Sequence, residues 1–432
     1  MLDALRWALS GSRARRVPII LGMAILLVFT GVLSAEAEAA DRDVARSLRD
    51  RDLAILLPTD DPVMRIGLGE AGFGRSWYRS LELAFGGTTV GPALEVENSY
   101  EDWRLVAVRI VPCQSLFDRP HDLAGRLCWP EVRLVLQPIV SGVEAAGRIW
   151  PHFADDRAVH LTYDYVAEGR SVPRELRDGL KSALGQPGIG GGGLSARLAD
   201  DLSRFESERD VNTLDLVRRA VALRLPGVRD NDVVGVDMRP EYALGETERR
   251  EFTRRMRGLL SAVRNTSPLP REVTAFSLPE GREPALLDDW VFLRFVAPAT
   301  ESLQAAPIEV RSARDGSVLA SVPGAPGLRV TMARDDDAIY EALEQRAGTP
   351  AEDQFRKNMI LFVPDIQANR DRIADGQQVR VANTTCGSCH KLGKLRFDLH
   401  SLSYLQGEPI TISPRVRRDV ALDLSWLAAW NP

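Results

Sequence analysis

Apolar residues recur at every second position along several stretches of the chain, a pattern typical of half-buried strands. Val132, Leu134 and Leu136 illustrate the spacing. The strands predicted in this way span residues 103–111, 131–140, 159–166, 273–278, 290–296, 308–311 and 318–322. Proline and glycine separate the last four, which are short.

Helical spacing of apolar residues predicts three helices. In residues 195–225, Leu198, Leu202 and Phe205 recur at intervals of three or four, and residues 246–263 follow a similar pattern. Ser413-Pro414 is a typical helix start, and the apolar positions after it predict a third helix near the C-terminus.

This order of elements predicts an α+β fold, with a large, mixed, β-rich N-terminal module followed by a small and mostly helical C-terminal segment. The glycine run at 187–194 indicates a flexible linker. The expected boundaries are 1–39 for an export signal, 40–186 for a β-rich module, 187–194 for the linker, 195–350 for an α+β module and 351–432 for the C-terminal segment.

Gly67, Gly69 and Gly72 formally match a dinucleotide-binding fingerprint. That fingerprint requires a preceding strand, and none is predicted here, so we expect a glycine-rich turn. His121, His152 and His160 are scattered along the chain and define no catalytic triad, because a triad is defined by geometry. No catalytic residue is assigned from the sequence.

Composition limits the function classes. The 432 residues are 44% hydrophobic and 27% charged, which is typical of a folded globular protein and excludes a disordered or polytopic membrane chain. The net charge of −5, with no long basic run, argues against nucleic acid as the main partner.

The N-terminus has the order of a secretory signal: a segment with four arginines, an apolar stretch at 17–33, and then small residues that include Ala37 and Ala39. We expect cleavage after Ala39 and a soluble periplasmic protein. An uncleaved membrane anchor is the alternative, although 17 residues are at the short limit for spanning a bilayer.

Cys113 and Cys128 lie just after the first predicted strand and just before the second. In an oxidising compartment this placement favours a structural disulfide that closes the loop between the strands.

Thr385-Cys386-Gly387-Ser388-Cys389-His390 carries the clearest chemical signal. Two cysteines three positions apart, followed at once by histidine, form the attachment pattern of a c-type haem. A redox dithiol or a zinc site could also contain a Cys-x-x-Cys pair. The flanking sequence lacks the pattern that is usual around a redox dithiol. It also lacks the two further ligands that a zinc site would need nearby.

On this motif the chain resembles the c-type cytochromes that have a single haem. The resemblance covers residues 386–390 and at most the tail to Pro432, so segment 351–432 is interpreted as cytochrome c-like. It implies a covalent haem c, with Cys386 and Cys389 bound to the vinyl groups and His390 as the proximal iron ligand.

The sequence leaves the identity of the opposite axial ligand undetermined. Cytochromes of this class usually supply a methionine downstream, and no methionine follows His390. His400 is the favoured ligand, an open or water-bound site is the next alternative, and Met359 is the third. A His/His iron would be low-spin, whereas an open position would bind small ligands.

The predicted C-terminal helix could cover the haem or simply pack in the core. The chain from residue 380 onward contains seven basic and four acidic residues, and Lys391 and Lys394 directly follow the motif. This excess of positive charge predicts an acidic redox partner protein.

Electron transfer through the haem iron is therefore the first functional hypothesis. A haem-dependent, peroxidase-like oxidoreductase with an open axial site is the second. A non-haem binding protein with a Cys-x-x-Cys disulfide is the third.

Overall fold

The structure is a computed structural model. It describes residues 40–58, 61–86, 99–116, 125–145, 148–154, 157–170, 174–184, 195–228, 239–277, 290–296, 303–305, 308–311, 318–322, 328–330 and 412–430.

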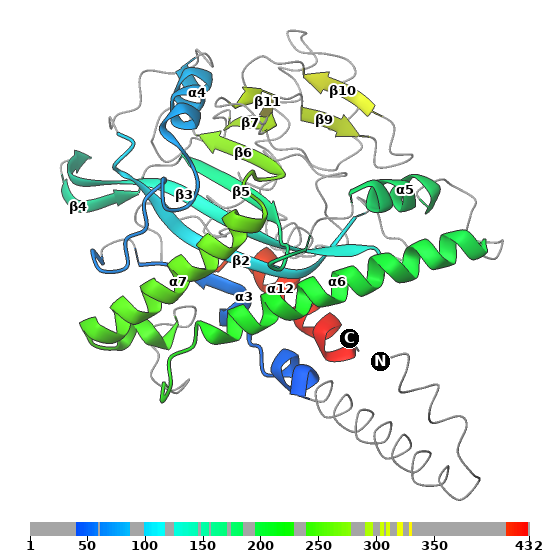
Figure 1. The fold of residues 1–432 in the computed structure, drawn as a ribbon. Coiled ribbons are helices and arrows are strands. Elements are labelled where there is room, and N and C mark those ends of the chain that lie inside the picture. The colour runs from blue at the N-terminus through cyan, green and yellow to red at the C-terminus, as the bar shows by residue number, and fades with distance from the viewer. Residues whose placement is uncertain are drawn as a thin grey trace, which may run out of the picture.

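An antiparallel sheet dominates the described part of the chain (Figure 1). Its main path has the order β1-β2-β3-β5-β6-β7-β11. These strands are β1 (Ala54–Leu56), β2 (Trp103–Ser115), β3 (Cys128–Ala145), β5 (Ala158–Asp164), β6 (Glu272–Ser277), β7 (Trp290–Val296) and β11 (Leu328–Val330). β4 (Arg148–Ala154) pairs with β3, and β8 (Gln304–Ala305) pairs with β7. A separate pair consists of β9 (Ile308–Arg311) and β10 (Val318–Val322).

Helices pack around this sheet. They are α3 (Asp50–Leu53), α4 (Arg75–Gly86), α5 (Arg174–Leu184), α6 (Ala196–Ala222), α7 (Glu246–Thr266) and α12 (Pro414–Ala429), with the 3₁₀ turn η3 (Pro240–Ala243) before α7. The α+β class is confirmed. None of the helices in the described ranges is long and apolar enough to cross a membrane.

The sequence signals for helix starts act as expected. The Ser195 hydroxyl accepts a hydrogen bond from the Leu198 amide at the start of α6. At α12 the Ser413 hydroxyl accepts from the Val416 amide, and Pro414 occupies the first turn. Each serine satisfies an amide that lacks a partner within the helix.

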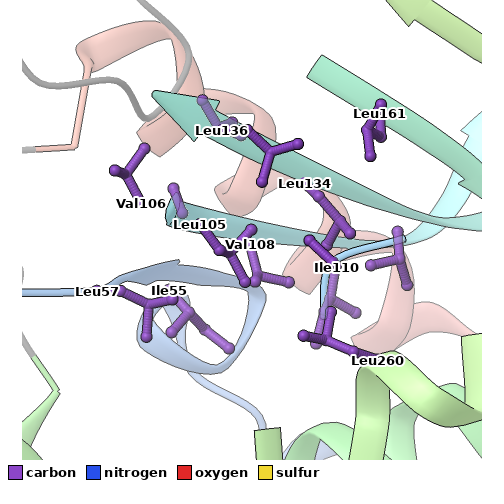
Figure 2. Packing of buried hydrophobic residues seen from close by; sticks show 14 of the residues in the cluster. Ile55, Leu57, Leu105, Val106, Val108, Ile110, Leu134, Leu136, Leu161 and Leu260 are labelled. Atoms are coloured by element: carbon purple, nitrogen blue, oxygen red, sulfur yellow. The ribbon is translucent and has the colours of Figure 1, made fainter. Parts of the chain in front are cut away.

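One face of the sheet is apolar and fully buried. Val108 of β2, Leu134 of β3, Leu161 of β5, Val273 of β6 and Phe295 of β7 stand in register across five strands, each at most 2% exposed. Leu260 of α7 belongs to the same hydrophobic cluster, as Figure 2 shows. Burial of this face is the main source of folding stability.

The opposite face carries polar residues in register. Arg133 of β3 pairs with Thr162 of β5, which pairs with Glu272 of β6. The next row joins His160 of β5 through Thr274 of β6 to Arg294 of β7. We call these six residues the polar face: Arg133, His160, Thr162, Glu272, Thr274 and Arg294. All six are partly exposed.

The sheet crosses the expected boundary at 187–194. β5 pairs with β6, so strands from the expected 40–186 and 195–350 modules belong to one sheet and one core. The glycine run itself lies outside the described residues. Strand pairing, which satisfies backbone hydrogen bonds, outweighs the local composition that suggested a separation.

Candidate functional site

The predicted haem-binding residues lie outside the described ranges. They are Cys386, Cys389 and His390, together with the two candidate distal ligands His400 and Met359. The expected signal at 1–39 and the basic Lys391 and Lys394 also lie outside them. The geometry of the candidate site therefore comes from the described residues on either side of segment 331–411.

Both described ends of this segment are fixed to the same sheet. Val330 ends β11, which is paired with β7. Ile412 is 4% exposed, and Ser413, which is fully buried, leads into α12, which contacts β2 and α3. Four strands lie between β2 and β11, so these two strands are five strand spacings apart, roughly 24 Å. The sheet between them carries the polar face on one side.

Helix α12 packs on the polar side of the sheet. Asp423 of α12 forms a buried ion pair with Arg109 of β2, which stands in register beside Arg133. Burial raises the pKa of Asp423, against the opposing attraction of Arg109. α12 thus occupies the β1–β2 end of this side and begins just after segment 331–411.

The apolar side of α12 is occupied by the protein core. Val416, Val420 and Leu427 are at most 5% exposed and belong to the same cluster as the sheet residues. Of the two roles that the sequence left open for this helix, the structure shows core packing.

Two buried carboxylates are neutralised next to the polar face. Glu131 lies between Arg133 and Arg271, and the Arg271 Nη2 to Glu131 Oε2 distance is 2.7 Å. Asp164 lies between Arg271 and Arg177, at 2.7 and 2.9 Å. Three guanidinium groups therefore meet these two carboxylates, and Arg177 also forms an ion pair with Asp178 at 3.4 Å. A buried carboxylate is stable only with such partners.

The surroundings of His160 lower its pKa. Burial lowers the pKa of His160, the positive charge of Arg133 lowers it further, and the result is about 4. The imidazole is therefore neutral at pH 7, and a neutral imidazole is the form that binds metals.

The second end of α12 meets the disulfide loop. Cys113 and Cys128 form a disulfide with a Cα to Cα distance of 5.0 Å, as expected from their positions beside the strands. The Trp426 indole donates to the Gly125 carbonyl at 3.2 Å, and Trp430 stacks on Trp426 at a centroid distance of 5.6 Å. This contact holds the C-terminal helix against the loop that the disulfide closes.

The glycine fingerprint at 67–72 has no βαβ context. The preceding strand β1 is antiparallel to β2, and α4 begins only at Arg75. Gly72 has a φ of +93°, and a Cβ there would meet Tyr163 and Arg264. These glycines form a tight turn, which agrees with the expectation from the sequence.

The described residues contain no group of three or more histidine, cysteine or acidic side chains placed to hold a metal ion. His160 is on β5 and His152 is on β4, whereas His121 lies outside the described ranges.

The sequence did not single out the polar face. The signal was present, because Arg133, His160 and Thr274 occupy the polar positions of predicted strands. Polar positions of a strand normally face solvent, and only the strand pairing shows that these lie together on one face of the sheet.

Comparisons with protein-family models, with curated proteins and with solved structures find no match to this chain.

Proposed function

We propose that this chain is an exported, mono-haem, c-type cytochrome-like protein that transfers electrons through a covalently attached haem. The observation that carries the proposal is the sequence Cys386-Gly387-Ser388-Cys389-His390. Cys386 and Cys389 would bind the haem vinyl groups, and His390 would be the proximal iron ligand.

The Cys113–Cys128 disulfide supports the compartment that this chemistry requires. Disulfides persist in oxidising compartments such as the periplasm and are rare in the cytosol. Covalent haem attachment at this motif takes place on the same side of the membrane. A chain with both features fits export, which the N-terminal pattern also favours.

The bound haem supplies a one-electron couple at its iron. The protein has to hold this group, keep its iron coordinated and present it to a partner. Lys391 and Lys394 place positive charge next to the attachment motif, which favours an acidic redox partner protein. The large α+β module would dock that partner or hold it in place.

Covalent haem is tested by expression together with haem-maturation machinery, followed by denaturing electrophoresis and a haem stain. The wild-type band should stain, and the C386S/C389S variant should not. The C113S/C128S variant is the matched control, because it also removes two cysteines yet should keep the stain. An unstained wild-type band would contradict the proposal and favour a non-haem binding protein.

Spectra then separate electron transfer from haem catalysis. A low-spin spectrum that cyanide and carbon monoxide do not change supports electron transfer. A high-spin spectrum that shifts with either ligand supports the peroxidase-like oxidoreductase, because an open axial position would bind both.

A further inference from the structure

The last turn of α12 is held in part by a polar contact near the surface. The indole of Trp426 donates to the Gly125 carbonyl at 3.2 Å, and Trp426 is only half-buried. Trp430 stacks on Trp426, and its own indole donates to Asp210 of α6 at 2.9 Å. The middle of the helix is anchored differently, because Val420 is 1% exposed and belongs to the core. The Trp426 side of the helix therefore responds to any change at Gly125.

The disulfide sulfurs lie beside the same carbonyl. Cys113 Sγ and Cys128 Sγ are 3.9 and 3.7 Å from the Gly125 oxygen. In the disulfide these sulfurs have no hydrogen to donate, and the oxygen accepts from Trp426 and, at 3.5 Å, from Arg209 Nη1. Reduction would give each sulfur an S–H group, which is a weak donor. Two new donors would then compete with the Trp426 indole for an oxygen that has two lone pairs.

The strands at the disulfide are paired irregularly. The β2–β3 register shifts between Val111 and Gln114, so Cys113 lies in the irregular stretch. β2 ends two residues later at Ser115, which stands opposite Cys128. The covalent bond therefore fixes strand ends that few ladder pairs hold. A cross-link over 15 positions restricts the open chain enough to change an opening equilibrium by about 100-fold.

The two sulfurs differ in their access to solvent. Cys128 is fully buried, whereas Cys113 is half-buried and lies beside the exposed Gly125. A reductant in solution therefore reaches the Cys113 sulfur first. Accessible disulfides are more labile than buried ones, and regulatory disulfides belong to this group.

We propose that the Cys113–Cys128 disulfide is a redox-sensitive latch for the C-terminal helix, with Cys113 as the sulfur that a protein dithiol attacks. In the oxidised state the latch holds Trp426 on Gly125, and in the reduced state it releases the Trp426 side of α12. The inference goes beyond the proposed function and does not depend on a bound haem.

The exchange reaction balances with a dithiol as the reductant. One thiolate of the dithiol attacks Cys113 Sγ and forms a mixed disulfide. The electron pair of the broken bond leaves with Cys128, which takes up a proton. The second thiol of the reductant then displaces Cys113 in the same way. The reductant gives up two electrons and two protons and becomes a disulfide, while the protein gains two thiols.

Other contacts confine the change to the end of the helix. Arg126, next to Gly125, pairs with Glu206 of α6 at 2.6 Å. The buried ion pair of Asp423 with Arg109 holds α12 on β2. Neither contact involves a sulfur atom, so both persist after reduction. We therefore expect local release of the last turn of α12 and not unfolding of the sheet.

Amide hydrogen exchange of the full chain, followed by mass spectrometry, tests the latch. The oxidised protein is compared with protein reduced by dithiothreitol. Residues 424–430 should exchange at least about 10-fold faster after reduction, within the roughly 100-fold that loss of the cross-link allows. Residues 256–263 of α7, which contribute Met256, Leu260 and Val263 to the core, should exchange equally in both states.

Three variants control for the source of the change. C113S/C128S should exchange rapidly at residues 424–430 with or without dithiothreitol. C386S/C389S also removes two cysteines, yet it should respond to dithiothreitol as wild type does, which separates the latch from the haem. W426F lacks the indole donor, so its last turn should already exchange rapidly in the oxidised state.

Equal exchange at residues 424–430 in oxidised and reduced wild type would overturn the inference. Faster exchange throughout the chain, α7 included, would overturn it as well, because the bond would then stabilise the whole fold. Both comparisons use wild type and remain valid if a cysteine variant fails to fold. Neither outcome bears on the haem stain, which tests the proposed function separately.

A second experiment identifies the sulfur that is attacked. The oxidised protein is treated briefly with glutathione, quenched with acid and alkylated, and its peptides are analysed by mass spectrometry. The glutathione adduct should be found on Cys113, with Cys128 alkylated. An adduct mainly on Cys128, or a disulfide that glutathione leaves untouched, would contradict the assignment of Cys113 as the accessible sulfur.

Discussion

The two faces of the central sheet differ in composition and therefore in what they contribute. The apolar face consists of Val, Leu and Phe rows that are almost completely buried under α7 and its neighbours. The polar face carries arginine, histidine, threonine and glutamate in equally regular rows. A sheet needs only one apolar face to fold, so the residues of the second face need not be apolar.

The largest effect should come from the apolar face. Leu134→Ala removes a side chain that is 1% exposed at the centre of the sheet, and we expect a loss of about 3 kcal/mol in unfolding free energy. Urea denaturation measures it. Thr162→Ala, on the neighbouring strand but on the polar face, is the control and should cost less than about 1 kcal/mol. Equal losses would show that the two faces do not differ as described.

A slightly smaller effect is expected where α12 meets the polar side. Asp423→Ala leaves the buried Arg109 guanidinium without its carboxylate, at a cost of about 2–3 kcal/mol. Two carbonyl oxygens, of Leu53 and Ile110, still accept from Arg109 and limit the loss.

The double variant Arg109→Met with Asp423→Leu tests the same pair differently. Replacement of both ionic partners by apolar residues should recover most of the stability, because no unpaired charge remains. If the double variant is less stable than Asp423→Ala alone, the cost came from lost packing of α12 and not from the unpaired charge.

The pH dependence of stability sharpens the comparison further. In the haem-free C386S/C389S variant the folded state holds the pKa of His160 at about 4, below the ordinary value of 6.5. The unfolded chain binds the proton first, so stability falls as the pH is lowered from 6.5 to 4, by roughly 2–3 kcal/mol in total. His160→Gln should flatten this part of the curve, and His152→Gln should not.

Arg133→Gln separates the two causes of this shift. Burial is the larger cause and Arg133 the smaller, so the pKa of His160 should rise in this variant yet remain below 6.5. Titration of the imidazole by nuclear magnetic resonance measures it. A pKa at the ordinary value would mean that charge, not burial, is the main cause.

Local signals predicted most of the secondary structure. The alternation at 131–140 and 159–166 corresponds to β3 and β5, and Ser413-Pro414 begins α12 as expected. The two loop cysteines also lie in the disulfide that their positions beside the strands suggested. Each of these features depends on residues close together in the sequence.

Contacts between distant residues could not be predicted in this way. Arg109 and Asp423 are 314 positions apart, and no pattern in either segment points to the other. The pairing of β5 with β6 across the glycine run is of the same kind. The polar face follows from such strand pairings, so the sequence supplied its residues without showing that they meet.

The intact mass of the chain purified from cells with haem-maturation machinery tests the central claim most directly. The account predicts the mass of the polypeptide plus one haem in wild type, and of the polypeptide alone in C386S/C389S. A wild-type protein with no added haem mass would contradict it.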